Sequence, residues 1–176
     1  MKWFVILLIS IAVIALLLSN ANLWPFSQPS PIEQIEIIPT PTQTDEEVMG
    51  VKKELETIIN RTLPTDAEQA TLRDVTGQGY QGFVTRKFTN QTFELTVLAD
   101  LPQLQSNTFY QTWLVKSQPD QPNFDLVSAG KLQSRKGGWI LDFTSNLNLT
   151  DYQGLVVTRE STEDQTPETH ILEGNF

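Results

Sequence analysis

Residues 77–82 read Gly-Gln-Gly-Tyr-Gln-Gly and have the G-x-G-x-x-G spacing that, in dinucleotide-binding proteins, cradles a pyrophosphate. That chemistry requires a strand before the glycines and a helix after them, because the helix N-terminus binds the phosphates. Here the following residues alternate, with Phe83, Thr85 and Lys87 on one side, which predicts a strand in place of the helix. The glycines therefore favour a turn or a bulge over a nucleotide site.

The ionisable residues do not form a recognisable catalytic or metal-binding set. His170 is the single histidine, so the chain cannot assemble a multi-histidine metal site or a serine triad with a spare base. Glu160, Glu163, Asp164 and Glu168 could offer oxygen ligands to calcium or a pair of acid and base carboxylates. EF-hand-like spacing and its glycine are both missing, which favours a solvated acidic loop. We predict a non-enzymatic protein without catalytic residues, metal or cofactor.

Three aromatic residues could form a ligand platform. Tyr110, Trp113 and Trp139 lie in apolar, alternating stretches and are most simply side chains of the core. If they were exposed beside the polar glutamine and threonine of the same stretch, they could bind carbohydrate or peptide. The sequence favours the core and leaves the platform open as an alternative.

The charge of the chain limits its partners. The formal net charge is -9, and the twelve lysines and arginines are scattered singly or in pairs. Nucleic acid recruits clustered basic residues, so we predict no nucleic-acid partner. The chain has no cysteine, which excludes disulfides, thiolate metal sites and a lipid-modified cysteine as a membrane tether. Any membrane tether must therefore be a peptide segment.

The N-terminal segment, residues 1–23, predicts that tether. Its apolar run is interrupted only by Ser10 and follows Lys2, which keeps the N-terminus in the cytoplasm and sends the rest of the chain outward. We predict a single span in the plasma membrane with the globular domain extracytoplasmic. The alternative is a cleavable signal peptide, because Ser19 and Ala21 are spaced as signal peptidase prefers.

Two segments connect this span to the globular domain. Residues 24–44 contain five of the ten prolines among Ser, Thr and Gln, and predict a disordered, extended linker. Residues 45–62 change character, with Val48, Val51 and Leu55 at near-helical spacing behind three acidic residues at the start. They predict one short amphipathic helix, whose apolar stripe packs on the domain or, as the alternative, on a partner helix.

Residues 65–176 predict an all-β domain. Turn residues recur about every eight to twelve positions, which is typical of a sandwich or barrel, and the short connections require antiparallel pairing. We predict an antiparallel β-sandwich of immunoglobulin-like size with about eight strands. These strands span residues 70–75, 80–88, 92–99, 109–116, 125–132, 139–143, 154–159 and 169–172.

Several motifs in this domain are family-specific. They are Leu101-Pro102, Tyr110-Gln111-Thr112-Trp113-Leu114-Val115, Ser128-Ala129-Gly130, Leu155-Val156-Val157-Thr158, and Pro167-Glu168-Thr169 with Gly174. From about Thr71 to the C-terminus, the chain resembles the C-terminal domain of anti-sigma-K factors. The resemblance implies the extracytoplasmic half of a membrane-spanning regulator, whose cytoplasmic half sequesters a sigma factor until proteolysis releases it. Within the motifs, we expect Leu101, Pro102, Tyr110, Gln111, Trp113, Leu114, Ser128, Ala129, Gly130, Pro167 and Gly174 to be mainly structural.

The chain departs from that family in two places. Only Met1 and Lys2 precede the apolar run of the predicted span, where the family's helical sigma-binding domain should stand. Residues 160–164 are polar and acidic, where the family usually has a glycine-rich turn. We therefore predict a membrane-anchored sensor or scaffold that binds another protein of the membrane or envelope, with any role in sigma-factor regulation exerted through a separate partner. The alternative is a secreted or surface module that binds glycan or peptide after cleavage by signal peptidase.

Overall fold

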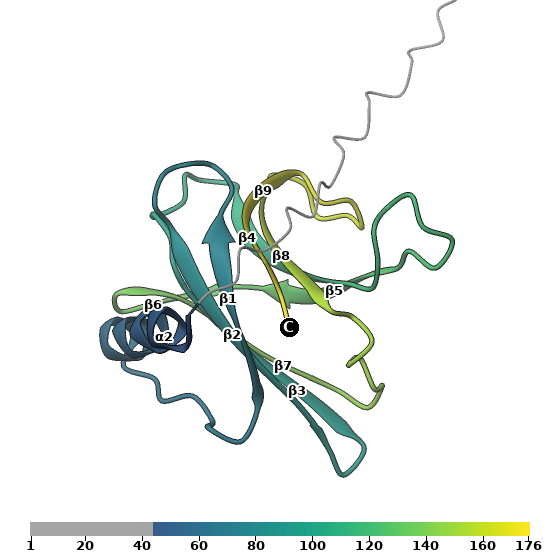
Figure 1. Cartoon of the computed structure of the whole chain (residues 1–176). Coiled ribbons are helices and arrows are strands. Elements are labelled where there is room, and N and C mark those ends of the chain that lie inside the picture. Colours follow the sequence, from purple (N-terminus) through teal and green to yellow (C-terminus); the bar gives the residue numbers. More distant parts are fainter. Residues whose placement is uncertain (1–43) are drawn as a thin grey trace, which may run out of the picture. The chain divides into compact units, whose positions relative to one another are not determined.

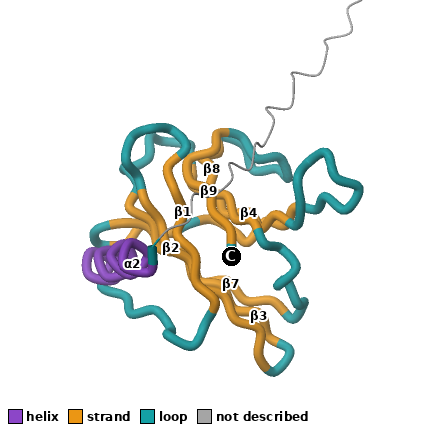
Figure 2. Tube along the Cα trace, viewed as in Figure 1, coloured by secondary structure: helices purple, strands orange, loops and turns teal. Residues whose placement is uncertain are grey.

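A computed structural model describes residues 44–176, which all lie within one compact unit of the chain. This part is mostly β, with one helix (Figures 1 and 2). Each of the eight predicted strands is present, because alternation and turn residues are local signals. The strands are β1 (Glu68–Asp74), β2 (Gln81–Thr89), β3 (Thr92–Asp100), β4 (Phe109–Val115), β5 (Leu126–Lys131), β6 (Gln133–Arg135), β7 (Gly138–Ser145), β8 (Gly154–Glu160) and β9 (Thr169–Asn175).

The prediction of a two-sheet sandwich with eight strands is wrong in its arrangement. The nine strands form one antiparallel sheet in the order β5-β4-β8-β9-β1-β2-β3-β7-β6. The additional strand is β6, a fully exposed segment of three residues that pairs with β7 across a tight turn. It was missed because it is too short and too polar to show alternation.

The sheet is nearly closed into a barrel. Its two edge strands, β5 and β6, are consecutive in the chain and are separated only by Leu132. One bent stretch of chain therefore pairs with β4 at one end of the sheet and with β7 at the other. Because the same stretch supplies both edges, the sheet curves back on itself and encloses its own core.

The main core fills the inside of this curved sheet. Strand β3 shows the predicted alternation: Phe93, Leu95 and Val97 are buried in the core, whereas Glu94 is exposed on the outer face. The same inner face of β4 and β8 contributes further apolar side chains to one continuous cluster. Burial of this cluster is the main source of stability in a chain that has no disulfide.

The helix α2 (Asp45–Ile59) packs on the outer face of the sheet (Figure 2). Thr44 caps its N-terminus by accepting a hydrogen bond from the Glu47 amide, and three acidic residues follow in the first turn, where they favour the helix dipole. Leu55 and Ile59 pack in a second cluster whose sheet residues come from β2, β3 and β7. The helix therefore covers the outer face at these three strands, as its apolar stripe predicts.

The predicted span, residues 1–23, and residues 24–43 of the predicted linker lie outside the described residues. Between residues 44 and 176, no helix is both long enough and apolar enough to cross a membrane.

Candidate functional site

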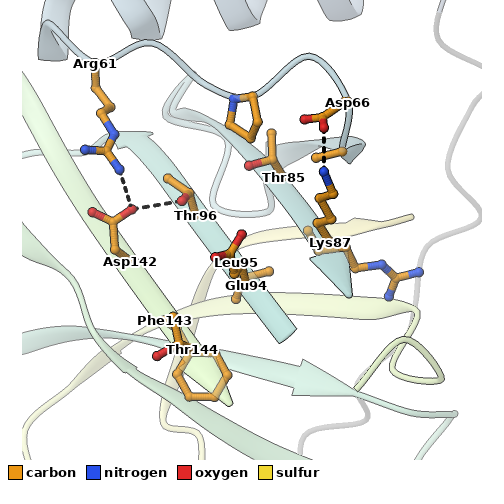
Figure 3. A pocket seen from close by; sticks show the side chains of 13 residues that line it. Arg61, Asp66, Thr85, Lys87, Glu94, Leu95, Thr96, Asp142, Phe143 and Thr144 are labelled. Atoms are coloured by element: carbon orange, nitrogen blue, oxygen red, sulfur yellow. Dashed lines mark hydrogen bonds and ion pairs between the residues drawn. The ribbon is translucent and has the colours of Figure 1, made fainter. Parts of the chain in front are cut away.

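A groove of about 470 Å³ lies on the outer face of the sheet, beside α2 (Figure 3). Its roof is the connection from α2 to β1, represented by Arg61, Pro64, Asp66 and Ala67. Its floor comes from the outward-facing residues of β2, β3 and β7. These are Thr85, Lys87, Glu94, Thr96, Asp142 and Thr144.

Two ion pairs hold the roof over the floor. Arg61 Nη2 donates to Asp142 Oδ1 at 2.9 Å, and the Thr96 hydroxyl donates to the same oxygen at 2.8 Å. At the other end of the roof, the Lys87 ammonium pairs with Asp66 (Figure 3). The roof is thus fastened to β7 at one end and to β2 at the other.

The side chains of the floor lie in cross-strand pairs, because antiparallel pairing places outward side chains opposite one another. Thr85 pairs with Thr96, and Lys87 with Glu94, across β2 and β3. Although Lys87 and Glu94 are cross-strand partners, the Lys87 ammonium bonds to Asp66 in the roof. Among the described residues, Glu94 therefore has no basic partner and remains an exposed carboxylate.

Most of the outward-facing charges of the groove are paired with one another. The hydrogen bond and the charge of Lys87 lower the pKa of Asp66, so this carboxylate stays ionised and paired. In the described part of the chain, no group of three or more histidine or acidic side chains is placed to hold a metal ion. The chemistry that the groove offers is hydrogen bonding by threonine hydroxyls and ion pairing at Glu94.

The glycine motif at residues 77–82 forms a turn, as predicted, and is followed by strand β2. Gly77 and Gly79 have φ angles of 75° and 81°, a left-handed conformation that favours glycine. Asp74 closes the turn, because its carboxylate accepts hydrogen bonds from the amides of Thr76 at 2.7 Å and Gly79 at 2.6 Å. Burial raises the pKa of Asp74, but these hydrogen bonds outweigh burial and lower it overall. The carboxylate thus organises the turn.

The acidic residues near the C-terminus do not act as one exposed loop. Glu160 ends β8 and is 1 % exposed, which corrects its placement in a solvated loop. Its Oε1 accepts from the Glu168 amide at 3.1 Å. Glu168 in turn accepts hydrogen bonds from Ser161 and Thr162, which lower its pKa. These carboxylates shape the β8–β9 connection.

His170 lies in β9, with Nδ1 2.5 Å from Glu173 Oε1.

The first family motif fixes the connection between β3 and β4. Leu101 is buried, and its carbonyl accepts from Trp139 Nε1 at 2.9 Å. The Pro102 carbonyl accepts from the Tyr110 hydroxyl at 3.4 Å. Tyr110 meets Trp139 edge-to-face, with ring centroids 5.0 Å apart. Both rings lie in the main core, so they cannot form an exposed platform.

The strand motif on β4 divides between the two faces of the sheet. Tyr110 and Leu114 belong to the main core, whereas Trp113 belongs to a small cluster on the opposite face, with Val115 and Val156. Trp113 is 1 % exposed, and its Nε1 donates to Thr158 Oγ1 at 2.8 Å. The carbohydrate or peptide platform suggested for these aromatic residues is therefore absent from the described surface.

The remaining motif residues also lie in or against the sheet. Gln111 is buried on the Trp113 face of β4, and Ser128 is half-buried opposite Trp113 on β5. Ala129 joins the main core beside Gly130, whose φ of 118° accompanies a shift in the β4–β5 register. Pro167 lies in the β8–β9 connection. Gly174 lies where β9 crosses β1, and a Cβ there would be 2.4 Å from the Thr71 carbonyl oxygen.

The groove residues were not singled out from the sequence. Alternation along β2 and β3 could have placed Thr85, Lys87, Glu94 and Thr96 on one face. No local signal connects Arg61 to β7, because the residues that meet there are far apart in the chain. The structure thus locates the groove away from the family motifs.

The fold and the groove together define a small β-domain with an open polar groove on the outer face of its sheet. The chain matches, over residues 7–171, the family described as the C-terminal part of anti-sigma-K factor rskA, and it belongs to that family. The match begins well before the segment from Thr71 that carries the motifs. Domains of this family are regulatory and non-catalytic, and they form the extracytoplasmic part of anti-sigma-K factors. No curated protein and no solved structure matches the chain significantly.

Proposed function

We propose that this protein is a membrane-anchored sensor or scaffold that acts outside the cytoplasm by binding another protein. The observation that carries the proposal is the groove. Two ion pairs join its roof to its floor, and between them lie threonine hydroxyls and the unpaired carboxylate of Glu94. Such a surface supplies hydrogen bonds and charge complementarity, which are the means by which proteins recognise polar segments of a partner. A role in sigma-factor regulation, through a separate protein, is consistent with the family.

The anchor belongs to this proposal. Residues 1–23 supply a peptide tether in a chain without cysteine, and Lys2 orients it with the N-terminus inside. A tethered domain meets membrane partners at high effective concentration, so even a weak groove contact becomes useful. The anchor therefore supports a binding role for the groove.

Mass spectrometry of the protein extracted from its native membranes tests both parts. The expected result is a chain that starts at Met1 and co-purifies reproducibly with one protein, whose recovery falls when Glu94→Lys fills the groove with the opposite charge. The control is Glu54→Lys, an equally acidic position on the exposed side of α2. A chain that starts at Asn22, alone in the soluble exported fraction, would contradict the proposal and favour a secreted module.

A further inference from the structure

We propose that the free edge of β7, beside the groove, accepts an extended basic segment of the partner protein as an added β-strand. This inference rests on the proposed function and specifies the chemistry of the partner. Strand addition supplies affinity through main-chain hydrogen bonds and specificity through alternate side chains. It requires an unpaired strand edge and, beside it, a surface that selects the side chains.

The edge is present on β7. Strand β3 pairs with β7 from Trp139 to Ser145, along almost its whole length. On the other side, β6 pairs with β7 only from Gly138 to Ile140. The chain that precedes β6 belongs to β5, which pairs with β4. No other described strand pairs with residues 141–145 on this side. Residues 142–144 of β7 therefore line the groove and have one edge that pairs with no described strand.

The β2–β3 hairpin fixes which main-chain groups point to each side. Its two turn residues, 90–91, have φ angles of 52° and 63°, as in the tight two-residue turns of hairpins. The residues that flank such a turn, Thr89 and Thr92, form a hydrogen-bonded pair. Because hydrogen-bonded and non-bonded pairs alternate, Thr96 also directs its main-chain groups to β2, and Leu95 directs its own to β7.

The same alternation determines the free edge. Leu95 pairs with Phe143, so the amide and carbonyl of Phe143 point to β3. The amides and carbonyls of Asp142 and Thr144 point away from β3. They point to the same side as those of Ile140, which pairs with β6. No described backbone or side chain is hydrogen-bonded to them. The unpaired main-chain groups thus belong to two residues whose side chains line the groove.

The one outward-facing charge of the groove that has no partner, the carboxylate of Glu94, selects a basic segment. Thr144 is the cross-strand partner of Glu94, and both side chains are exposed on the outer face. A strand added to β7 would lie two strand spacings, about 10 Å, from Glu94. A lysine or arginine opposite Thr144 can reach over the threonine and pair with the Glu94 carboxylate. The net charge of -9 also attracts a basic partner.

Two other occupants fit this charge poorly. The chain's own linker, residues 24–44, contains Glu33 and Glu36, no lysine or arginine, and prolines that lack the amide needed for pairing. A second copy, pairing through the same edge of β7, would add another unpaired Glu94 carboxylate and no unpaired basic residue of the groove. A basic segment of a different protein is the occupant that the groove favours.

The test measures binding of a peptide to the full chain purified in detergent. The probe is a fluorescent peptide of four Lys-Val repeats, and the control peptide has four Glu-Val repeats. Fluorescence anisotropy should show at least about tenfold tighter binding of the Lys-Val peptide, with an affinity that falls as salt is added. Absence of Lys-Val binding, or equal binding of both peptides, would overturn the proposal.

Paired variants separate strand addition from general attraction between charges. Thr144→Pro removes an outward amide that forms no bond in the free protein, and should weaken binding about tenfold. Its control is Ser134→Pro, because the Ser134 amide on β6 also points away from β7, outside the groove. Glu94→Gln should weaken binding about threefold to tenfold, whereas Glu54→Gln should not. Circular dichroism checks that each variant is folded. If Thr144→Pro bound the Lys-Val peptide as tightly as the wild type, the proposal of strand addition at β7 would be wrong.

Native membranes then distinguish this inference from the proposed function. If the partner is recovered equally with wild type and with Thr144→Pro, the protein binds a partner and the β7 edge is not the site. If the peptide binds as expected but no partner is recovered from membranes, the edge is a strand-binding site and the proposed function is wrong.

Discussion

Arg61 and Asp142 lie 81 residues apart in the chain and form an ion pair, with Arg61 Nη2 2.9 Å from Asp142 Oδ1. Arg61 follows helix α2 and Asp142 lies in β7, so the contact fastens the connection after the helix to the outer face of β7. This contact and the pair between Asp66 and Lys87 define the groove. The groove therefore depends on side chains that only the tertiary fold brings together.

We expect Arg61→Ala to loosen the roof of the groove with little loss of stability. Both side chains are about half exposed, and exposed pairs contribute about 0.5 kcal/mol. Hydrogen exchange of the amides at residues 62, 63 and 65–67 should accelerate, while that of β2 should not change. Arg135→Ala, an exposed arginine on β6, is the control. Unchanged exchange at residues 62–67 would show that the pair does not restrain the roof.

Trp113 should be important for stability although it lies outside the main core. Trp113→Ala removes a ring that is 1 % exposed and should cost about 3–5 kcal/mol. Trp113→Phe retains a ring but loses the hydrogen bond to Thr158, and should cost about 2 kcal/mol. Urea unfolding measures both. Leu147→Ala, at a side chain that is 68 % exposed, should change stability by less than about 0.5 kcal/mol.

A methyl group at Gly174 should be poorly tolerated. Its Cβ would lie 2.4 Å from the Thr71 carbonyl oxygen, so one of the two strands must move. We expect Gly174→Ala to lower the free energy of unfolding by about 1–3 kcal/mol. Gly50→Ala is the matched control, because that position lies in α2 with no atom within 4 Å of the added methyl. It should be neutral or stabilising by up to about 1 kcal/mol. Equal effects of the two substitutions would contradict the close approach of β9 to β1.

Tyr152 should make the stability depend on alkaline pH. Its hydroxyl donates to Asp125, and this hydrogen bond, with burial, raises the pKa of Tyr152 from 10.0 to about 12. A raised pKa means that the folded protein favours the protonated phenol. The contribution of Tyr152 is therefore complete below pH 10 and is lost as the pH rises towards 12.

Unfolding of the wild type and of Tyr152→Phe should reveal this dependence. The difference in their unfolding free energies should be constant below pH 10 and should shrink above it. Titration of tyrosinate absorbance should show that Asp125→Asn returns the pKa of Tyr152 towards 10.0. A difference in free energy that does not vary up to pH 12 would show that the phenol does not titrate as described.

Local patterns were sufficient to predict the elements of the domain. The alternation of Phe93, Leu95 and Val97 predicts which face of β3 is buried, since successive side chains of a strand point to opposite faces. The helix is predicted because its apolar residues recur at helical spacing. The glycine motif is interpreted as a turn because a strand follows it. Each of these inferences depends only on residues that are close in sequence.

The arrangement of strands and the groove could not be predicted in this way. Whether the strands form a sandwich or one curved sheet depends on which edges meet, and here Leu132 lets consecutive segments occupy opposite edges. The burial of Glu160, at the end of β8, likewise depends on neighbours that β pairing brings to it. Pairing between distant strands leaves little trace in the local composition.

The sequence by itself determined that the chain is acidic and free of cysteine, and it predicted a helix over residues 45–62 followed by an antiparallel β-domain, whose motifs resemble those of the family. These properties follow from charge, periodicity and turn residues, which act over a few positions. Only the tertiary structure decided that the strands form one curved sheet, and that Arg61, Glu94 and Asp142 line the same groove. The reason is physical: closure of the sheet sets which distant side chains become neighbours, and no single segment contains that information.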